Sequence, residues 1–208
     1  MKENTSLISD SYRELNKKLH DSNVSYGSNG HRWAKTIRYL VQENNLQEIL
    51  DYGCGKQTLK KSLTDIQVYG YDPAFPELAQ LANPADLVFC GDVLEHIEPD
   101  YLEAVLDDLQ RVTKKLGFFV ISTRPAKKTL ADGRNAHISL LPVSEWAILL
   151  AKRFNLVAVI DYLPEFDKQS LTDIILDKLK LNTTGFNSIK PQKGEVIFLV
   201  NTKKGITT

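Results

Sequence analysis

The chain has 208 residues, enough for one α/β domain with a sizeable core, and we expect a single domain over residues 1–208. Its 26 basic and 26 acidic residues cancel, so composition does not indicate a whole-surface attraction to nucleic acid or to anionic membrane. No apolar run could span a bilayer, no signal-peptide pattern opens the sequence, and two cysteines cannot form a disulfide framework. These features predict a cytoplasmic protein without a membrane partner.

The first part of the chain, residues 1–45, is predicted to form a helical cap on the remainder. An amphipathic stretch spans Leu7 to Leu19, and residues 26–30 have the composition of a loop. Apolar residues then recur at helical spacing from Trp33 to Asn44. We expect Trp33 to pack this helix against a sheet.

A glycine turn at residues 49–57 is the most informative stretch. An apolar run ends at Asp51, and Gly53 and Gly55 flank one position before a predicted helix at Lys56–Leu63. Such a pattern is typical of a parallel strand that feeds a tight turn and a helix N-terminus with unpaired N–H groups. Glycine permits backbone angles closed to other residues and lets a ligand approach the main chain.

Two further strands follow the turn. The second, residues 66–72, ends at Asp72, about twenty residues after the turn, where nucleotide-binding sheets place a carboxylate on ribose hydroxyls. The third is predicted at Asp86–Cys90. Only 13 residues separate Asp72 from Asp86, and three prolines interrupt them, so we expect one helical turn, at Glu77–Leu81, and an outer strand that is vestigial or absent.

The rest of the chain predicts alternating helices and strands. Strands followed by helices imply right-handed crossovers and a sheet covered on both faces, with ligands at the carboxyl ends of the central strands. The expected elements are a helix from Pro99 that stops at Gly117, a strand at Phe118–Ser122, a loop at Thr123–Leu141, a helix capped by Ser144, strands at Leu156–Ile160 and Glu195–Val200, and between these strands a helical insertion at about 165–190.

Three features together resemble the class I S-adenosylmethionine (SAM)-dependent methyltransferases of the Leu-Glu-His type, over roughly residues 46–160. They are the Asp-x-Gly-x-Gly turn at 51–55, the strand-end Asp72 and the Asp-Val-Leu-Glu-His-Ile segment at 92–97. The resemblance implies a Rossmann-like, doubly wound α/β core at 46–208. Its sheet would be mostly parallel, with the last strand antiparallel and an abbreviated second βα unit.

The same resemblance implies a cofactor, SAM, and the residues that bind it. Asp51, Gly53, Cys54 and Gly55 would surround its methionyl part, and Asp72 would accept hydrogen bonds from both ribose hydroxyls. The other reading of Asp72 is a turn or helix-capping residue before a proline.

Near the reactive end of the cofactor the resemblance places Gly91 and Asp92. N-terminal helices cover the cofactor in this family, so Tyr26 or Trp33 could cap it. Cys54 and Cys90 end neighbouring predicted strands and are expected to be small buried side chains rather than redox groups.

His96 and His137, with Glu95, are the candidate catalytic residues. If residues 92–96 turn helically, Asp92, Glu95 and His96 share one face. One interpretation is a general base, His96 or His137, with a pKa near neutral. A second is a divalent metal site, since small-RNA methyltransferases that act on a 3′-terminal ribose carry a comparable Glu-x-x-Glu-His and a later His. A third is a structural turn. The first and third are favoured over metal.

The loop at 124–134 holds four basic residues, Arg124, Lys127, Lys128 and Arg134, against one acid, Asp132. It could bind an anionic acceptor, although a solvated loop is the simpler interpretation. Aromatic residues are not interleaved with these charges, which weighs against a nucleic-acid surface.

The predicted function is therefore SAM-dependent methyl transfer to oxygen or nitrogen of a small molecule or sugar. An RNA 3′-end ribose methyltransferase with a divalent metal is the alternative enzyme, and a degenerate SAM-binding partner module is the non-enzymatic one. A nicotinamide-dependent oxidoreductase is disfavoured, because Lys56-Gln57-Thr58 follows Gly55 in place of the three-glycine spacing.

Overall fold

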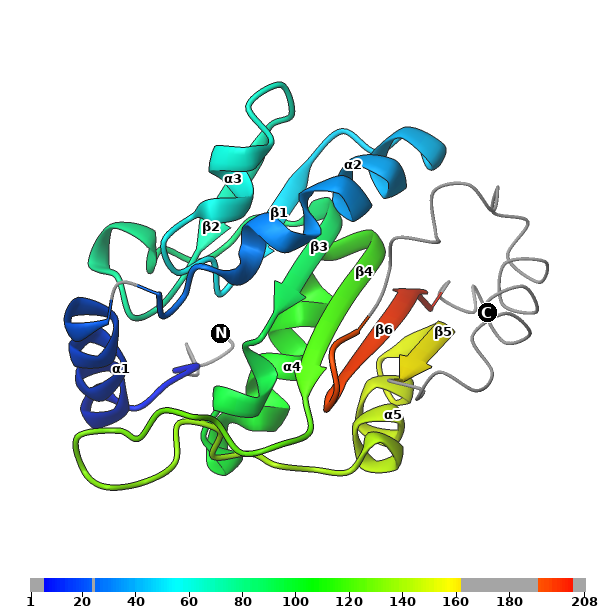
Figure 1. The fold of residues 1–208 in the computed structure, drawn as a ribbon. Helices are drawn as coiled ribbons and strands as arrows, with labels where there is room; N and C mark the ends of the chain where they lie inside the picture. Colours follow the sequence, from blue (N-terminus) through cyan, green and yellow to red (C-terminus); the bar gives the residue numbers. More distant parts are fainter. Residues whose placement is uncertain (1–5, 24, 162–190, 204–208) are drawn as a thin grey trace, which may run out of the picture.

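The computed structural model describes residues 6–23, 25–161 and 191–203 (Figure 1). The helical insertion predicted at about 165–190 lies outside the described residues. No helix among those that are described is both long enough and apolar enough to cross a bilayer.

A six-stranded sheet organises the described chain, in the order β2-β1-β3-β4-β6-β5. The strands β2, β1, β3 and β4 are parallel to one another, whereas β6 pairs antiparallel with both β4 and β5. A mostly parallel sheet with an antiparallel last strand was predicted and is confirmed. The strands are β1 (Ile49–Tyr52), β2 (Val68–Tyr71), β3 (Ala85–Gly91), β4 (Thr113–Ser122), β5 (Phe154–Asp161) and β6 (Glu195–Thr202).

Helices cover both faces of the sheet (Figure 1). On one face α4 and α5 pack over side chains such as Leu50, Val88 and Phe119. On the other face α2 and α3 pack over the alternate side chains, such as Ile49 and Leu87. The helical elements are α1 (Asp10–Ser22), η1 (Asn29–Trp33), α2 (Ala34–Glu43), α3 (Thr58–Ser62), η2 (Pro76–Leu78), η3 (Leu94–His96), α4 (Pro99–Val112) and α5 (Val143–Ala151).

The connection from β2 to β3 is abbreviated, as predicted. It contains one 3-10 turn, η2, which begins at Pro76 rather than at Glu77 and ends at Leu78. No strand lies between Asp72 and Pro84, so β2 forms an edge of the sheet. A proline at the start of η2 supplies a fixed φ angle and has no N–H to leave unpaired.

Three local predictions were wrong. The helix α4 ends at Val112 rather than Gly117, because residues 113–117 pair with β3 and extend β4 toward the sheet's amino end. The helix after the glycine turn begins at Thr58 rather than Lys56, since Gln57 is left-handed with φ of 54°. Pro142 holds the N-cap position of α5, so Ser144 lies inside the helix instead of capping it.

The helix α1 lies at the carboxyl ends of the parallel strands, beside the loop after β4 (Figure 1). Ser9, its N-cap, accepts a hydrogen bond from the Tyr12 N–H and donates its own hydroxyl to Glu98 at 2.8 Å. The Tyr12 hydroxyl donates to the carbonyl of His96 at 2.6 Å. These contacts fix α1 over the segment that follows β3.

Candidate active site

A cavity of roughly 610 Å³ opens where the parallel strands end. Most of the residues predicted to bind a ligand line it: Asp51, Gly53, Cys54, Asp72, Gly91, Asp92, His96 and His137. Gly55 and Glu95 are not among the lining residues. These residues lie close together because neighbouring parallel strands end at the same edge of the sheet.

The glycine turn is held by backbone hydrogen bonds to its neighbours. The N–H groups of Gly53 and Cys54 both donate to the carbonyl of Tyr71, at 2.7 and 3.0 Å. Gly53 has φ of 75°, and a Cβ there would lie 2.3 Å from a methyl carbon of Val93. The turn therefore needs glycine for its backbone angle and for the close approach of the segment after β3.

Gly55 packs against protein backbone. A Cβ on it would lie 2.6 Å from the carbonyl oxygen of Gly27, which also accepts from the Lys56 N–H at 2.9 Å. Its own N–H donates to Asp72 Oδ2 at 2.8 Å. The unpaired N–H groups expected directly after the turn are thus already used within the chain.

Asp72 organises the end of β2 and also faces the cavity. Its Oδ1 accepts from the Ala74 N–H at 3.0 Å, in addition to the bond from Gly55. The side chain is 7% exposed, and burial raises its pKa. Both predicted roles, a turn residue and a carboxylate at a ligand site, are compatible with this position, because each oxygen retains a second lone pair.

Asp51 lies near the carboxyl end of β1, one residue before its last residue, Tyr52, and close to Asp72. Burial, and then the neighbouring Asp72 carboxylate, raise the pKa of Asp51 to about 8. Burial also raises the pKa of the Cys54 and Cys90 thiols, and both cysteines are buried and free. Thiols held in the neutral form are poor nucleophiles, which fits the interpretation of small packing side chains.

Asp92 follows β3 in a left-handed conformation, with φ of 56°. Its N–H donates to the carbonyl of Val120 at 3.0 Å, and its Oδ2 accepts from the Asn29 amide at 2.9 Å. Burial raises the pKa of its carboxyl group. The left-handed residue and the 3-10 turn η3 replace the predicted helical turn, so Asp92, Glu95 and His96 do not share one helical face.

His96 and His137 meet across the cavity wall. Their ring centroids are 4.6 Å apart, with the ring planes at 89°. His96 Nδ1 lies 2.8 Å from the carbonyl oxygen of Ala136, and His137 Nδ1 lies 2.6 Å from that of Arg124. Desolvation and then His137 lower the pKa of His96 to about 3, so His96 does not have the near-neutral pKa expected of a general base.

Glu95 is fully buried beside this pair. Its Oε1 accepts from the Ser122 N–H at 3.0 Å, whereas its Oε2 has no hydrogen-bond partner among the described residues. Burial, followed by the charge of Asp92, raises the pKa of Glu95 well above its usual range. One oxygen of this carboxyl group is therefore buried without compensation.

The aromatic residues considered as caps separate into two roles. Trp33 is buried among core residues, edge-on to Phe118 with ring centroids 5.4 Å apart, and does not line the cavity. It packs the helical cap on the sheet, as predicted. Tyr26 does line the cavity, and its hydroxyl lies 3.3 Å from His96 Nδ1.

Sequence reasoning missed the contribution of α1. Tyr12, Asn16 and His20 lie one turn apart on this helix, and all three line the cavity. Their spacing of four residues could have revealed the shared face, since it places them on one side of the helix. A search for apolar residues at helical spacing does not find this face, because Asn16 and His20 are polar.

Basic side chains stand at the cavity wall on the loop after β4. Arg124, Lys127 and Lys128 line the cavity, and none has an ion-pair partner within the described ranges. Arg134 instead pairs with Asp132 at 2.7 Å and is not a lining residue. Three of the four basic residues predicted as an anion site therefore face the same cavity as the glycine turn.

Known proteins match both the sequence and the fold. A family described as a methyltransferase domain matches residues 25–162. No curated protein sequence matches the chain. Crystal structures with the same fold include the 1,6-didemethyltoxoflavin-N1-methyltransferase of Burkholderia thailandensis, solved with 1,6-didemethyltoxoflavin and S-adenosylhomocysteine. It is 16% identical, with a TM-score of 0.59 over 93% of this chain and 90% of that one.

Two further structures have similar values. The magnesium protoporphyrin IX methyltransferase of Synechocystis PCC 6803, solved with SAM, is 15% identical, with a TM-score of 0.57 over 96% of this chain and 100% of that one. The N-methyltransferase NodS of Bradyrhizobium japonicum WM9, solved with S-adenosylhomocysteine, is 12% identical, with a TM-score of 0.55 over 94% and 100%.

At these identities the structures support the fold, and the family match spans more than half of the sequence. The narrower Leu-Glu-His subtype stays a prediction. The chain belongs to the methyltransferase-domain family and has the Rossmann-like fold of its class I members.

Proposed function

We propose that the protein transfers a methyl group from SAM to oxygen or nitrogen of a small-molecule or sugar acceptor. The observation that carries the proposal is that Asp51, Asp72 and Asp92, near the ends of three parallel strands, all line the same cavity. Its volume of roughly 610 Å³ lies within the range of cofactor and ligand pockets, which is about 300–1,000 Å³.

The residues present fit the charge and shape of this cofactor. SAM carries a positively charged sulfonium and an ammonium group, and the cavity wall supplies the buried carboxyl groups of Asp51 and Asp72. A cationic ligand would favour their ionised forms. The unused lone pairs of Asp72 suit ribose hydroxyls, which are donors.

Methyl transfer from SAM requires the protein mainly to position the methyl donor and the acceptor. When bound, SAM supplies a methyl group on a sulfonium, which leaves as a neutral thioether when an acceptor oxygen or nitrogen displaces it in line. The chain would hold the acceptor in line with that carbon and exclude water from the path. The acceptor loses one proton in the process, and His96 and His137 line the cavity into which such a proton would be released.

Small-molecule acceptors are supported by the size and charge of the cavity. Arg124, Lys127 and Lys128 present positive charge at the wall, with no ion-pair partner among the described residues, which suits an acceptor with a carboxylate or phosphate group. Proteins with the same fold include methyltransferases named for small molecules, 1,6-didemethyltoxoflavin and magnesium protoporphyrin IX.

A thermal-shift and calorimetry panel tests the proposal. SAM and S-adenosylhomocysteine should raise the melting temperature of the protein, whereas NAD should not. The Asp72→Asn variant should lose most of the SAM-dependent shift. Stabilisation by NAD alone would overturn the proposal, and binding of SAM without methyl transfer to any acceptor in a cell extract would favour the partner module.

A matched control separates ligand binding from turn stability. Asp132 Oδ1 accepts from the N–H two residues later, on Arg134, at 3.1 Å, as Asp72 Oδ1 does from Ala74. Asp132 does not line the cavity. The Asp132→Asn variant should therefore keep the full SAM-dependent shift.

A further inference from the structure

Three side chains with metal-binding atoms converge at the cavity wall. One ligand atom each from Glu95, His96 and His137 lies within 4.8 Å of the other two. Glu95 and His96 come from η3 after β3, and His137 comes from the long loop after β4. Chain segments 40 residues apart are thus brought together by the parallel pairing of β3 and β4.

Both imidazoles are held in the tautomer that a metal requires. A backbone carbonyl can only accept a hydrogen bond, so His96 Nδ1, 2.8 Å from the Ala136 oxygen, must carry a hydrogen. The same holds for His137 Nδ1, 2.6 Å from the Arg124 oxygen. The lone pair of each ring therefore sits on Nε2. Metal-bound histidines characteristically donate the other ring N–H to a carbonyl or carboxylate in this way.

The carboxylate supplies an independent observation. Glu95 is 0% exposed, and its Oε1 is occupied by the Ser122 N–H. Its Oε2 is buried with no hydrogen-bond partner among the described residues. A buried, unpaired carboxylate oxygen is costly unless a cation or a donor compensates it. No basic side chain is paired with it in the described chain.

We propose that Glu95, His96 and His137 bind one divalent first-row transition-metal ion, such as Zn²⁺ or Mn²⁺. Two imidazole nitrogens and one carboxylate oxygen suit such ions, whereas Mg²⁺ and Ca²⁺ prefer oxygen ligands throughout. Ligands at about 2.0–2.2 Å from Zn²⁺ lie about 3–4 Å from one another, so a small approach of the three side chains completes the shell.

The ion would keep coordination positions open toward the cavity, since three protein ligands leave at least one position for water or substrate. His96 and His137 line that cavity. An acceptor hydroxyl bound there would be oriented and made more acidic, which favours an oxygen acceptor. This catalytic role rests on the proposed methyl transfer, but metal binding itself does not.

Metal binding can be measured without any activity assay. The protein, freed of metal with a chelator, is titrated with Co²⁺ and followed by visible d–d absorption. Equilibrium dialysis against Zn²⁺ or Mn²⁺ with elemental analysis gives the stoichiometry. We expect one ion per chain. His96→Ala and His137→Ala should each weaken binding by at least about tenfold and remove the Co²⁺ bands.

His31 provides the matched control. It is exposed, its Nδ1 lies 2.7 Å from the Ser28 carbonyl oxygen, and it does not line the cavity. His31→Ala should bind the ion as the wild type does. If the wild type takes up no ion, or if His96→Ala and His137→Ala bind as tightly as His31→Ala, the proposal is wrong.

Both histidines are half-buried, and the His137→Ala variant keeps the test decisive if His96→Ala fails to fold. SAM binding is measured on the same samples by calorimetry. A protein that binds metal but not SAM would refute the proposed function and support the metal site. A protein that binds SAM but no metal would refute the metal site and leave the proposed function unaffected.

Discussion

At the scale of single residues, burial of the two acidic side chains near the ends of β1 and β2 is a cost to the fold of the unliganded protein. Asp51 is 3% exposed and Asp72 is 7% exposed. Burial and mutual repulsion raise the pKa of Asp51 to about 8, so it is mostly protonated at neutral pH without a ligand. Carboxyl groups at such positions are typical of binding sites, where function and stability conflict.

This arrangement predicts how the stability of the unliganded protein depends on pH. The Asp51 pKa is raised from about 3.9 in an unfolded chain, so the folded state binds more protons between pH 4 and 8. The free energy of unfolding should therefore fall as pH rises through this window, by up to about 1.4 kcal/mol per pH unit from this group. Asp51→Asn should flatten the slope and stabilise the unliganded protein at pH 8.

Urea unfolding at pH 5, 6, 7 and 8 measures these slopes. Glu77→Gln, which changes an exposed carboxyl group, serves as the control and should leave the slope unchanged. The same Asp51→Asn protein should bind SAM more weakly than the wild type. Equal slopes for wild type and Asp51→Asn would show that Asp51 does not titrate in this window.

At the scale of secondary-structure elements, the sequence predicted the strands better than the helix ends. The first three strands follow apolar runs that end in Asp or Gly, and prolines revealed the missing unit between β2 and β3. The end of α4 was not predictable, because residues 113–117 leave the helix to pair with β3, a long-range contact that local propensity does not contain.

Some residues of the candidate site could be predicted from the sequence, and others could not. The residues at strand ends were found, because parallel strands end at one edge and motif spacing marks those ends. The approach of His137 to Glu95 and His96 depends on the path of a long loop, which the sequence does not specify. The shared face of α1 was hidden because two of its three cavity-lining residues, Asn16 and His20, are polar.

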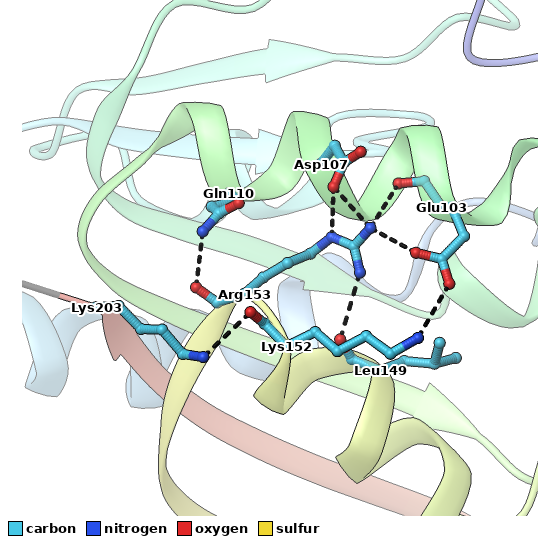
Figure 2. Close-up of polar contacts among 7 residues, drawn as sticks. All are labelled: Glu103, Asp107, Gln110, Leu149, Lys152, Arg153 and Lys203. Atoms are coloured by element: carbon cyan, nitrogen blue, oxygen red, sulfur yellow. Dashed lines mark hydrogen bonds and ion pairs between the residues drawn. The ribbon is translucent and has the colours of Figure 1, made fainter. Parts of the chain in front are cut away.

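One polar joint holds the α4 layer to the α5–β5 turn, and Figure 2 shows it centred on Arg153. The guanidinium donates to Asp107 Oδ1 at 2.7 Å and to Glu103 Oε2 at 2.6 Å, both on α4. Gln110, also on α4, donates to the Arg153 carbonyl at 2.9 Å. The Arg153 side chain is 9% exposed, so these contacts are shielded from solvent on the arginine side.

Replacing Arg153 should therefore be costly for stability without affecting the cavity. Arg153→Ala removes two charge-assisted hydrogen bonds and buried aliphatic packing, and we expect a loss of about 2–3 kcal/mol in the free energy of unfolding. Arg38→Ala is the matched control. It breaks a two-point ion pair with Asp65 in which the side chains are 35% and 60% exposed, so it should cost clearly less than Arg153→Ala.

Chemical denaturation of both variants gives the two values, and SAM calorimetry checks that affinity is retained, since no residue of the joint lines the cavity. If Arg153→Ala and Arg38→Ala lower the free energy of unfolding equally, then the buried contacts of Arg153 stabilise the protein no more than an exposed ion pair does.

At the scale of the whole molecule, α1 and the loop after β4 form one wall of the cavity, beyond the carboxyl ends of the parallel strands. The helix is attached through Ser9 to Glu98 and through Tyr12 to the carbonyl of His96. Its apolar contacts, with Leu130 and Ala136, are to that loop rather than to the sheet. Elements held by few contacts open locally at lower free energy than the core, and ligands enter through such openings.

Ligand binding should then protect this wall from hydrogen exchange more than it protects remote helices. SAM at one hundred times its dissociation constant stabilises the bound state by about 2.7 kcal/mol, which corresponds to about hundredfold slower exchange for amides that open only after release. We expect that slowing in α1 and in the loop at 123–141. The helix α5 contributes no cavity-lining residue, so amides there that exchange by local fraying should keep their rates. Mass spectrometry of exchanged peptides from the full-length protein measures both. Equal protection of α1 and α5 would mean that the ligand acts only through global stability and that α1 is part of the rigid body rather than its entrance.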